Sequence, residues 1–136
     1  MVITEANGTI INTEEVYVHD DTLISISFDR ITSLMKLEFK KYRSNDKTYH
    51  MYFENVLCFE MTNCDFWGAS ECVLDFEYVN RDSRILIPKL LSKWQNTPDP
   101  PKNISYDNYL ETVFTFTSGD QLRIVCKSIE FKYEIT

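Results

Sequence analysis

The sequence has few glycines, few histidines and no closely spaced cysteines, and each shortage excludes a kind of chemistry. Its glycines are Gly8, Gly68 and Gly119, which lie too far apart to form a glycine-rich phosphate-binding loop. Its four cysteines follow one another at spacings of 6, 8 and 54 residues, so the chain has no Cys-x-x-Cys motif. With only His19 and His50 to join them, a zinc site would need an unusual ligand set. We therefore expect neither a metal ion nor a cofactor.

Long apolar runs are also missing. No stretch approaches the roughly 18 apolar residues that cross a membrane, because polar residues interrupt every apolar segment. Residues 1–13 lack the basic start and the continuous apolar stretch of a secretory signal. We therefore expect a cytoplasmic protein without membrane association. In that reducing compartment, Cys58, Cys72 and Cys126 are expected to be small apolar core residues.

Basic residues are absent from two long stretches of the chain. Residues 1–29 and residues 48–80 each contain six acidic residues and no lysine or arginine. The formal net charge is −7 and the sequence pI is about 4.8. Because an acidic surface repels phosphate, we expect no binding to nucleic acids. The basic cluster within residues 36–47 is expected to be a solvated hairpin.

The residues that are present predict a single globular domain over residues 1–136. Of these residues, 43% are apolar and 14% aromatic, a composition that favours a hydrophobic core over disorder. Most of the chain alternates apolar and polar residues with period two, which is typical of strands with one solvated face. The alternating apolar groups are Ile24, Ile26 and Phe28; Met35, Leu37 and Phe39; Tyr49, Met51 and Phe53; Leu57, Phe59 and Met61; Leu74, Phe76 and Tyr78; Phe114 and Phe116; Leu122, Ile124 and Cys126; and Ile129, Phe131, Tyr133 and Ile135.

Turns and bends are expected at four places between these strands. Asp29-Arg30 and Ser118-Gly119-Asp120 suit hairpin turns. Glu54-Asn55 interrupts one long alternating run, and the parity of the apolar residues switches near Lys127-Ser128. Both of these interruptions predict a bulge or a bend.

One segment has a helical period. Ile87, Leu90, Leu91 and Trp94 form one apolar stripe, and Pro88 marks the first turn, where its missing N–H costs little. The expected fold is mainly β, of the α+β type, with about six to eight strands. It is a curved antiparallel sheet, or a partly open barrel or sandwich, with one helix inserted before the C-terminal strands.

The acidic stretch 48–80 is also rich in aromatic residues, and two interpretations are open. It could form an acidic and aromatic surface that steers and anchors a basic protein partner. Alternatively, its aromatic residues belong to the core and its carboxylates coat the solvated face, as the alternation favours for most of them. The candidate partner-binding residues are Tyr52, Glu54, Glu60, Trp67, Glu71 and Asp75.

Catalytic chemistry has little support in the sequence. His50 could act as a base for Cys58 or Cys126, but it lies on the polar side of its strand. His19 is followed by Asp20 and Asp21, and adjacent residues seldom point at one metal ion without distant partners. We therefore expect no catalytic residues and no enzymatic activity.

The order of the motifs resembles a known class of proteins. An acidic start is followed by strands, Phe53-Glu54-Asn55-Val56, Phe66-Trp67-Gly68, a helix and Ser118-Gly119-Asp120-x-Leu122-x-Ile124. Over residues 16–136 this order is similar to the small, acidic, β-rich immunity proteins encoded beside toxins in bacterial polymorphic-toxin and contact-dependent competition systems. The resemblance implies a cytoplasmic protein that binds and blocks a toxin domain without doing chemistry. It supplies no toxin-contacting residues, although many toxins of this kind are basic nucleases.

A second function stays open beside the immunity role. The domain could be a small-molecule-binding β-barrel in which aromatic residues such as Tyr49, Tyr52 and Trp67 line a cavity. A cavity large enough for a ligand distinguishes this possibility from a protein-binding surface.

Overall fold

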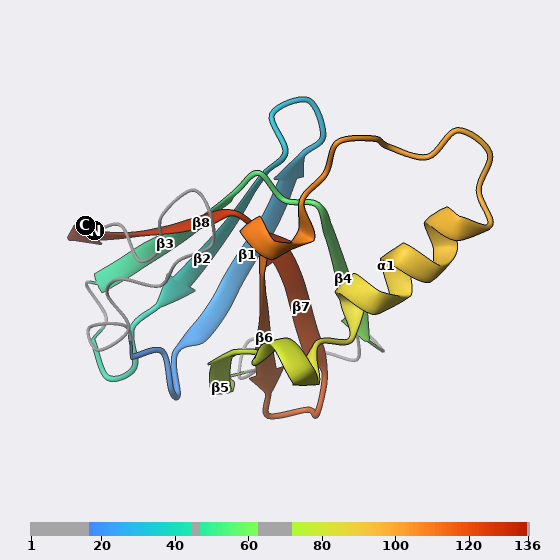
Figure 1. The fold of residues 1–136 in the computed structure, drawn as a ribbon. Helices are drawn as coiled ribbons and strands as arrows, with labels where there is room; N and C mark the ends of the chain where they lie inside the picture. Colours follow the sequence, from blue (N-terminus) through green and yellow to red (C-terminus); the bar gives the residue numbers. More distant parts are fainter. Residues whose placement is uncertain (1–16, 45–46, 63–71, 136) are drawn as a thin grey trace.

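The computed structural model describes residues 17–44, 47–62 and 72–135, and their strands form two four-stranded antiparallel sheets (Figure 1). The first sheet has the order β1 (Thr22–Asp29), β2 (Leu34–Lys40), β3 (Lys47–Glu54) and β8 (Ser128–Ile135). The second has the order β4 (Cys58–Thr62), β7 (Gln121–Cys126), β6 (Leu110–Phe116) and β5 (Val73–Tyr78). The predicted mainly β fold is confirmed, and within the described residues the sheets do not close into a barrel.

One hydrophobic core lies between the two sheets, and the alternation of apolar residues builds it. In β2 and β3 every second side chain is fully buried, as the sequence predicts. Phe53 of the first sheet meets Phe114 of the second edge-to-face, with their ring centroids 6.1 Å apart. Phe39 also lies 5.6 Å from Phe114. Side chains of the opposite parity therefore point to the outer faces of the two sheets.

A bent ribbon joins the two sheets. The paired strands β3 and β8 continue into the paired strands β4 and β7, and residues 55–57 face residues 126–127 at the bend. The Lys127 N–H donates to the Glu54 carbonyl at 3.1 Å, so the hydrogen-bond ladder persists through it. Asn55 has a φ of 53°, a left-handed conformation that Asn tolerates well. The bends predicted at Glu54-Asn55 and near Lys127-Ser128 are confirmed.

Two of the expected strand faces are shifted by a bulge. The pairing of β1 changes register between Leu23 and Ser25, and that of β5 changes between Val73 and Asp75. Ile24 and Leu74 are therefore exposed, at 47% and 44%, instead of pointing into the core. Both strands lie at sheet edges, where bulges are common because one side of the strand has no partner to hold its register.

The turns follow the local chemistry of the sequence. The Asp29 carboxylate accepts hydrogen bonds from the backbone N–H groups of Ile31 and Thr32, at 2.8 and 3.2 Å, and so closes the β1–β2 hairpin. Gly119 has a φ of 89° in the β6–β7 hairpin, which a side chain would strain. Both predicted hairpin turns are confirmed.

The predicted helix is α1 (Leu86–Gln95), and it lies outside the second sheet, beside β4 and β7 (Figure 1). Leu86 and Ile87 bury their side chains against Val125 of β7. Short 3-10 turns precede and follow the helix at Arg81–Ser83 and Tyr106–Asn108. Among the described residues, no helix has the length and apolarity needed to cross a membrane.

Candidate functional site

The structure places four of the six candidate partner-binding residues. Tyr52 and Glu54 lie on β3, Glu60 on β4 and Asp75 on β5. Trp67 and Glu71 lie outside the described residues. Tyr52 follows the buried Met51 and therefore points to the outer face of the first sheet.

The acidic stretch does not form one continuous surface. Asp75 pairs with Thr115, and both point away from the core side of the second sheet, where Phe114 is buried. Because the two sheets pack face to face, Tyr52 and Asp75 lie on opposite outer faces of the molecule. A single partner surface therefore includes one or the other.

The outer face of the first sheet has mixed charge. The Nζ atoms of Lys36 and Lys132 lie 5.7 and 5.1 Å from the centre of the Tyr52 ring. Lys132 is also 3.6 Å from a carboxylate oxygen of Glu130. Next to Tyr52 along β3, a ring nitrogen of His50 lies 2.7 Å from the Glu38 carboxylate. Tyr52 thus lies between two lysines, one of which pairs with Glu130, and the described side chains of this face offer no excess of negative charge.

Glu54 and Glu60 already have partners within the chain. The Ser128 hydroxyl donates to the Glu54 carboxylate at 3.2 Å, at the bend between the sheets. The Lys89 ammonium of α1 donates to the Glu60 carboxylate at 2.6 Å. These two carboxylates therefore have a structural role that competes with binding to an external cation.

A pair of exposed carboxyl groups stands on the outer side of β5. Asp75 and Glu77 are two residues apart on one strand, and both are exposed. A hydrogen bond with the Asp75 carboxyl group, together with its negative charge, raises the pKa of Glu77, and Arg123 offsets part of this rise. No ion pair among the described residues includes Asp75 or Glu77. The acid pair, defined as Asp75 and Glu77, therefore carries negative charge on this face that Arg123 offsets only in part.

The sequence identified one member of the acid pair and missed the other. Glu77 has the signal that identifies it, since side chains at positions i and i+2 of a strand point to the same face. Asp75 was a candidate because of its place in the acidic stretch, whereas Glu77 was not singled out from the other carboxylates of that stretch.

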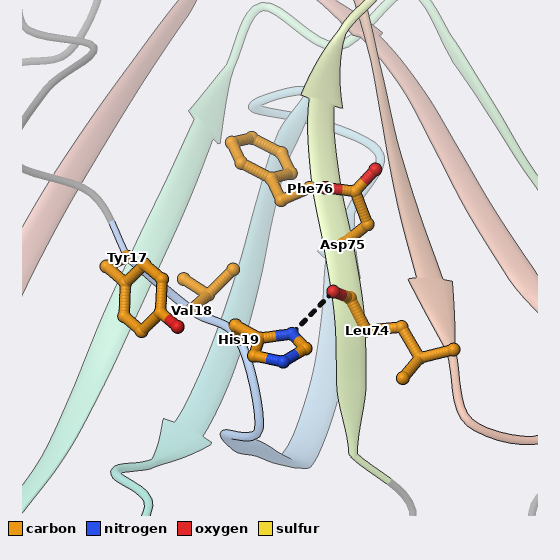
Figure 2. A pocket seen from close by; sticks show the side chains of 6 residues that line it. All are labelled: Tyr17, Val18, His19, Leu74, Asp75 and Phe76. Carbon is orange, nitrogen blue, oxygen red and sulfur yellow. Dashed lines mark hydrogen bonds between the residues drawn. The ribbon is translucent and has the colours of Figure 1, made fainter.

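A small cavity lies beside Asp75 of the acid pair (Figure 2). Its volume is about 110 Å³, and its lining residues are Tyr17, Val18, His19, Leu74, Asp75 and Phe76. The His19 ring links residues 17–19 to β5, because its Nδ1 atom lies 2.7 Å from the Leu74 carbonyl oxygen. Figure 2 shows this contact, with Tyr17 and Phe76 on the same side of β5. Tyr49 and Tyr52 take no part in this cavity and point to opposite faces of β3.

The residues that could support nucleophilic chemistry are separated. Cys126 lies in the core between the sheets, Cys58 lies under α1 on the outer side of the second sheet, and His50 is on the outer face of the first. Burial raises the pKa of the Cys126 thiol. Burial, with the charges of Glu111 and Glu60, raises the pKa of Cys58 to about 11. Both thiols are therefore held in their unreactive protonated form.

The described residues also contain no cluster of three or more histidine, cysteine or acidic side chains that could hold a metal ion. In the sequence, His19, Asp20 and Asp21 were weighed together as metal ligands. In the structure the His19 ring contacts the Leu74 carbonyl instead. Asp21 is buried and accepts hydrogen bonds from Tyr49 and Lys41.

A solved structure has a similar fold: an uncharacterized protein from Neisseria gonorrhoeae, with a TM-score of 0.51 and 13% sequence identity. The match covers 86% of this chain and 93% of that chain. At this level of identity the likeness shows the fold alone. No protein-family model matches the chain, and no curated protein matches its sequence.

Proposed function

We propose that the protein is an immunity protein of a bacterial toxin system, which binds a basic toxin domain in the cytoplasm and blocks it without catalysing a reaction. The acid pair carries this proposal. Two exposed carboxyl groups that repel each other are stabilised in their charged form when a cation approaches, because the cation offsets the negative charge of both. A lysine-rich or arginine-rich protein surface supplies such cations.

The state of the thiols supports a binding role over a catalytic one. A cysteine nucleophile needs a lowered pKa or an adjacent base, and the pKa of Cys58 is raised to about 11. His50 is engaged with Glu38 on the outer face of the other sheet, so it is not placed to act on this cysteine.

The size of the cavity beside β5 suits a side chain of a protein partner better than a small-molecule ligand at this place. Small-molecule sites usually enclose roughly 300–1,000 Å³. The cavity beside β5 has about 110 Å³. This volume suits a single side chain of a protein partner. The resemblance of the sequence to immunity proteins supplies the class of that partner.

Co-expression with the protein encoded next to this chain tests the proposal. We expect the tagged chain to retain one basic partner at low salt and to release it at about 0.5 M salt, where exposed charges are screened. We also expect the chain to protect cells from that partner. The variant Asp75→Lys/Glu77→Lys should lose retention, whereas Glu38→Lys/Glu130→Lys, on the opposite face, should keep it. A chain that retains no protein and protects no cells contradicts the immunity role.

A further inference from the structure

Strand β5 lies at the edge of the second sheet. The Val79 N–H donates to the Glu111 carbonyl of β6 at 2.8 Å. Since backbone groups alternate in direction along a strand, those of Glu77 also face β6, while those of Phe76 and Tyr78 face away. Among the described strands, none pairs with this outward side of β5.

A short segment of the chain already shows how this edge is paired. The Asp20 N–H donates to the Val73 carbonyl at 2.8 Å, and the Val73 N–H donates to the Asp21 carbonyl at 2.9 Å. This pairing is confined to the first residue of β5. Beyond it the described chain turns away at His19, whose ring contacts the Leu74 carbonyl. The edge is therefore geometrically competent to accept a strand, and among the described residues only Asp20 and Asp21 make main-chain hydrogen bonds to its beginning.

The cavity lies where this pairing stops (Figure 2). Tyr17 and Phe76 are among its lining residues, and Asp75 also lines it. The Tyr17 and Phe76 rings form a suitable place for a side chain with an apolar stem, whereas the Asp75 carboxylate points to the outer face of the sheet. A strand that continues along β5 would bring its side chains to this cavity.

The charges along the same edge specify what kind of strand fits. The side chains of Asp75 and Glu77 point to the outer face of the second sheet, although the backbone groups of these two residues face β6. In an added strand, residues two apart would lie beside these two carboxyl groups, because cross-strand neighbours are about 5 Å apart. Lysine or arginine at those two positions would neutralise the acid pair.

We propose that an extended segment of the basic partner adds to the second sheet along β5, with lysine or arginine side chains against Asp75 and Glu77 and an intervening side chain at the cavity. The inference rests on the proposed function, since it names the surface through which that partner binds. Main-chain hydrogen bonds to Phe76 and Tyr78 give such an edge its affinity, and the acid pair gives it specificity.

A synthetic peptide tests the edge without the natural partner. The probe is a blocked Lys-Thr-Lys-Thr-Lys peptide, and the matched control is Glu-Thr-Glu-Thr-Glu. We expect the lysine peptide to slow hydrogen exchange at the backbone N–H groups of Phe76 and Tyr78 in NMR spectra. The acidic peptide should leave both rates unchanged, since like charges repel.

Two charge-matched variants locate the interaction. Asp75→Asn/Glu77→Gln should weaken binding of the lysine peptide about tenfold, because two exposed ion pairs are lost. Asp82→Asn/Asp99→Asn removes the same charge from exposed loops and should change the affinity less than about twofold. Binding that is equal in both variants, protection that maps to other strands, or no binding overturns the edge assignment.

The same variants keep this inference separate from the proposed function. If the natural partner is retained and neutralised equally by both variants, the edge assignment fails and the immunity role stands. If the lysine peptide binds at β5 but no partner is retained and no cell is protected, the edge assignment stands and the immunity role fails.

Discussion

The carboxylate of Glu111 on β6 accepts a hydrogen bond of 3.0 Å from the backbone N–H of Leu86, the first residue of α1. It also accepts from the N–H groups of Ile85 and Ile87, at 2.9 and 3.1 Å. Arg123 balances its charge at 3.2 Å. A fully buried carboxylate from the sheet thus caps the helix, in place of a capping side chain at Ile85.

Removal of this cap should destabilise the whole domain. Glu111→Ala leaves three backbone N–H groups, two of them buried, and the Arg123 guanidinium without their acceptor, so the free energy of unfolding should fall by about 3 kcal/mol. Glu111→Gln keeps one acceptor oxygen and should cost less. Urea denaturation followed by circular dichroism measures both. Glu60→Ala, which breaks an exposed ion pair, is the control and should cost at most about 1 kcal/mol.

A second buried carboxylate holds the start of β1. Asp21 accepts a 2.6 Å hydrogen bond from the Tyr49 hydroxyl and a 2.8 Å bond from the backbone N–H of Tyr42. Tyr49→Phe should lower the free energy of unfolding by about 1–2 kcal/mol, because the charged acceptor loses one donor but keeps others. Tyr42→Phe, which alters a half-exposed ring, should change it by less than about 0.5 kcal/mol. Equal effects in the two variants would contradict a structural role for the Asp21–Tyr49 bond.

The acid pair should titrate as a coupled unit. Because its hydrogen bond to Asp75 and the charge of Asp75 raise the pKa of Glu77, Asp75→Asn should lower that pKa towards its ordinary value. NMR titration of the side-chain carboxyl carbon measures it. In the native protein Glu77 holds its proton to a higher pH than in the unfolded chain, so its contribution to stability falls as pH rises through this range. A Glu77 pKa that is unchanged in Asp75→Asn would show that the two groups do not interact.

The thiols should react in an order set by burial. With a pKa of about 11, Cys58 should react with iodoacetamide at pH 8 about a hundredfold more slowly than in the urea-unfolded chain, because thiolate is the reactive species. Its rate should rise with pH, and its contribution to stability should fall between pH 9 and pH 11, where the unfolded chain loses its proton first. Cys126 should react only after unfolding. Site-resolved mass spectrometry measures the rates, and fast alkylation of Cys58 at pH 8 would contradict its burial.

The periodicity of the sequence predicted most strands because alternation reports directly which face meets the core. It failed at Ile24 and Leu74, where an apolar residue in the expected register sits in a bulge. A bulge depends on how an edge strand meets its single partner, and this information is absent from the local pattern.

The sequence also could not reveal the role of Glu111. In a strand, a carboxylate at this parity has the pattern of an ordinary solvated residue, and the helix it caps begins 25 residues earlier in the chain. Only the packing of α1 across the outer face of the second sheet brings the two together. The acid pair was partly predictable, since the spacing of Asp75 and Glu77 places them on one face, but its position at an open edge follows from the strand order.

The bent ribbon also determines when the protein can fold during its synthesis. The first sheet needs β8 to complete it, and the second needs β7, so both sheets wait for residues beyond position 120. A ribosome must therefore release β7 before the second sheet has all its strands, and β8 before the first sheet has them. Until then the apolar inner faces of β2 and β3 have no complete sheet to pack against, so we expect these faces to stay exposed in the nascent chain.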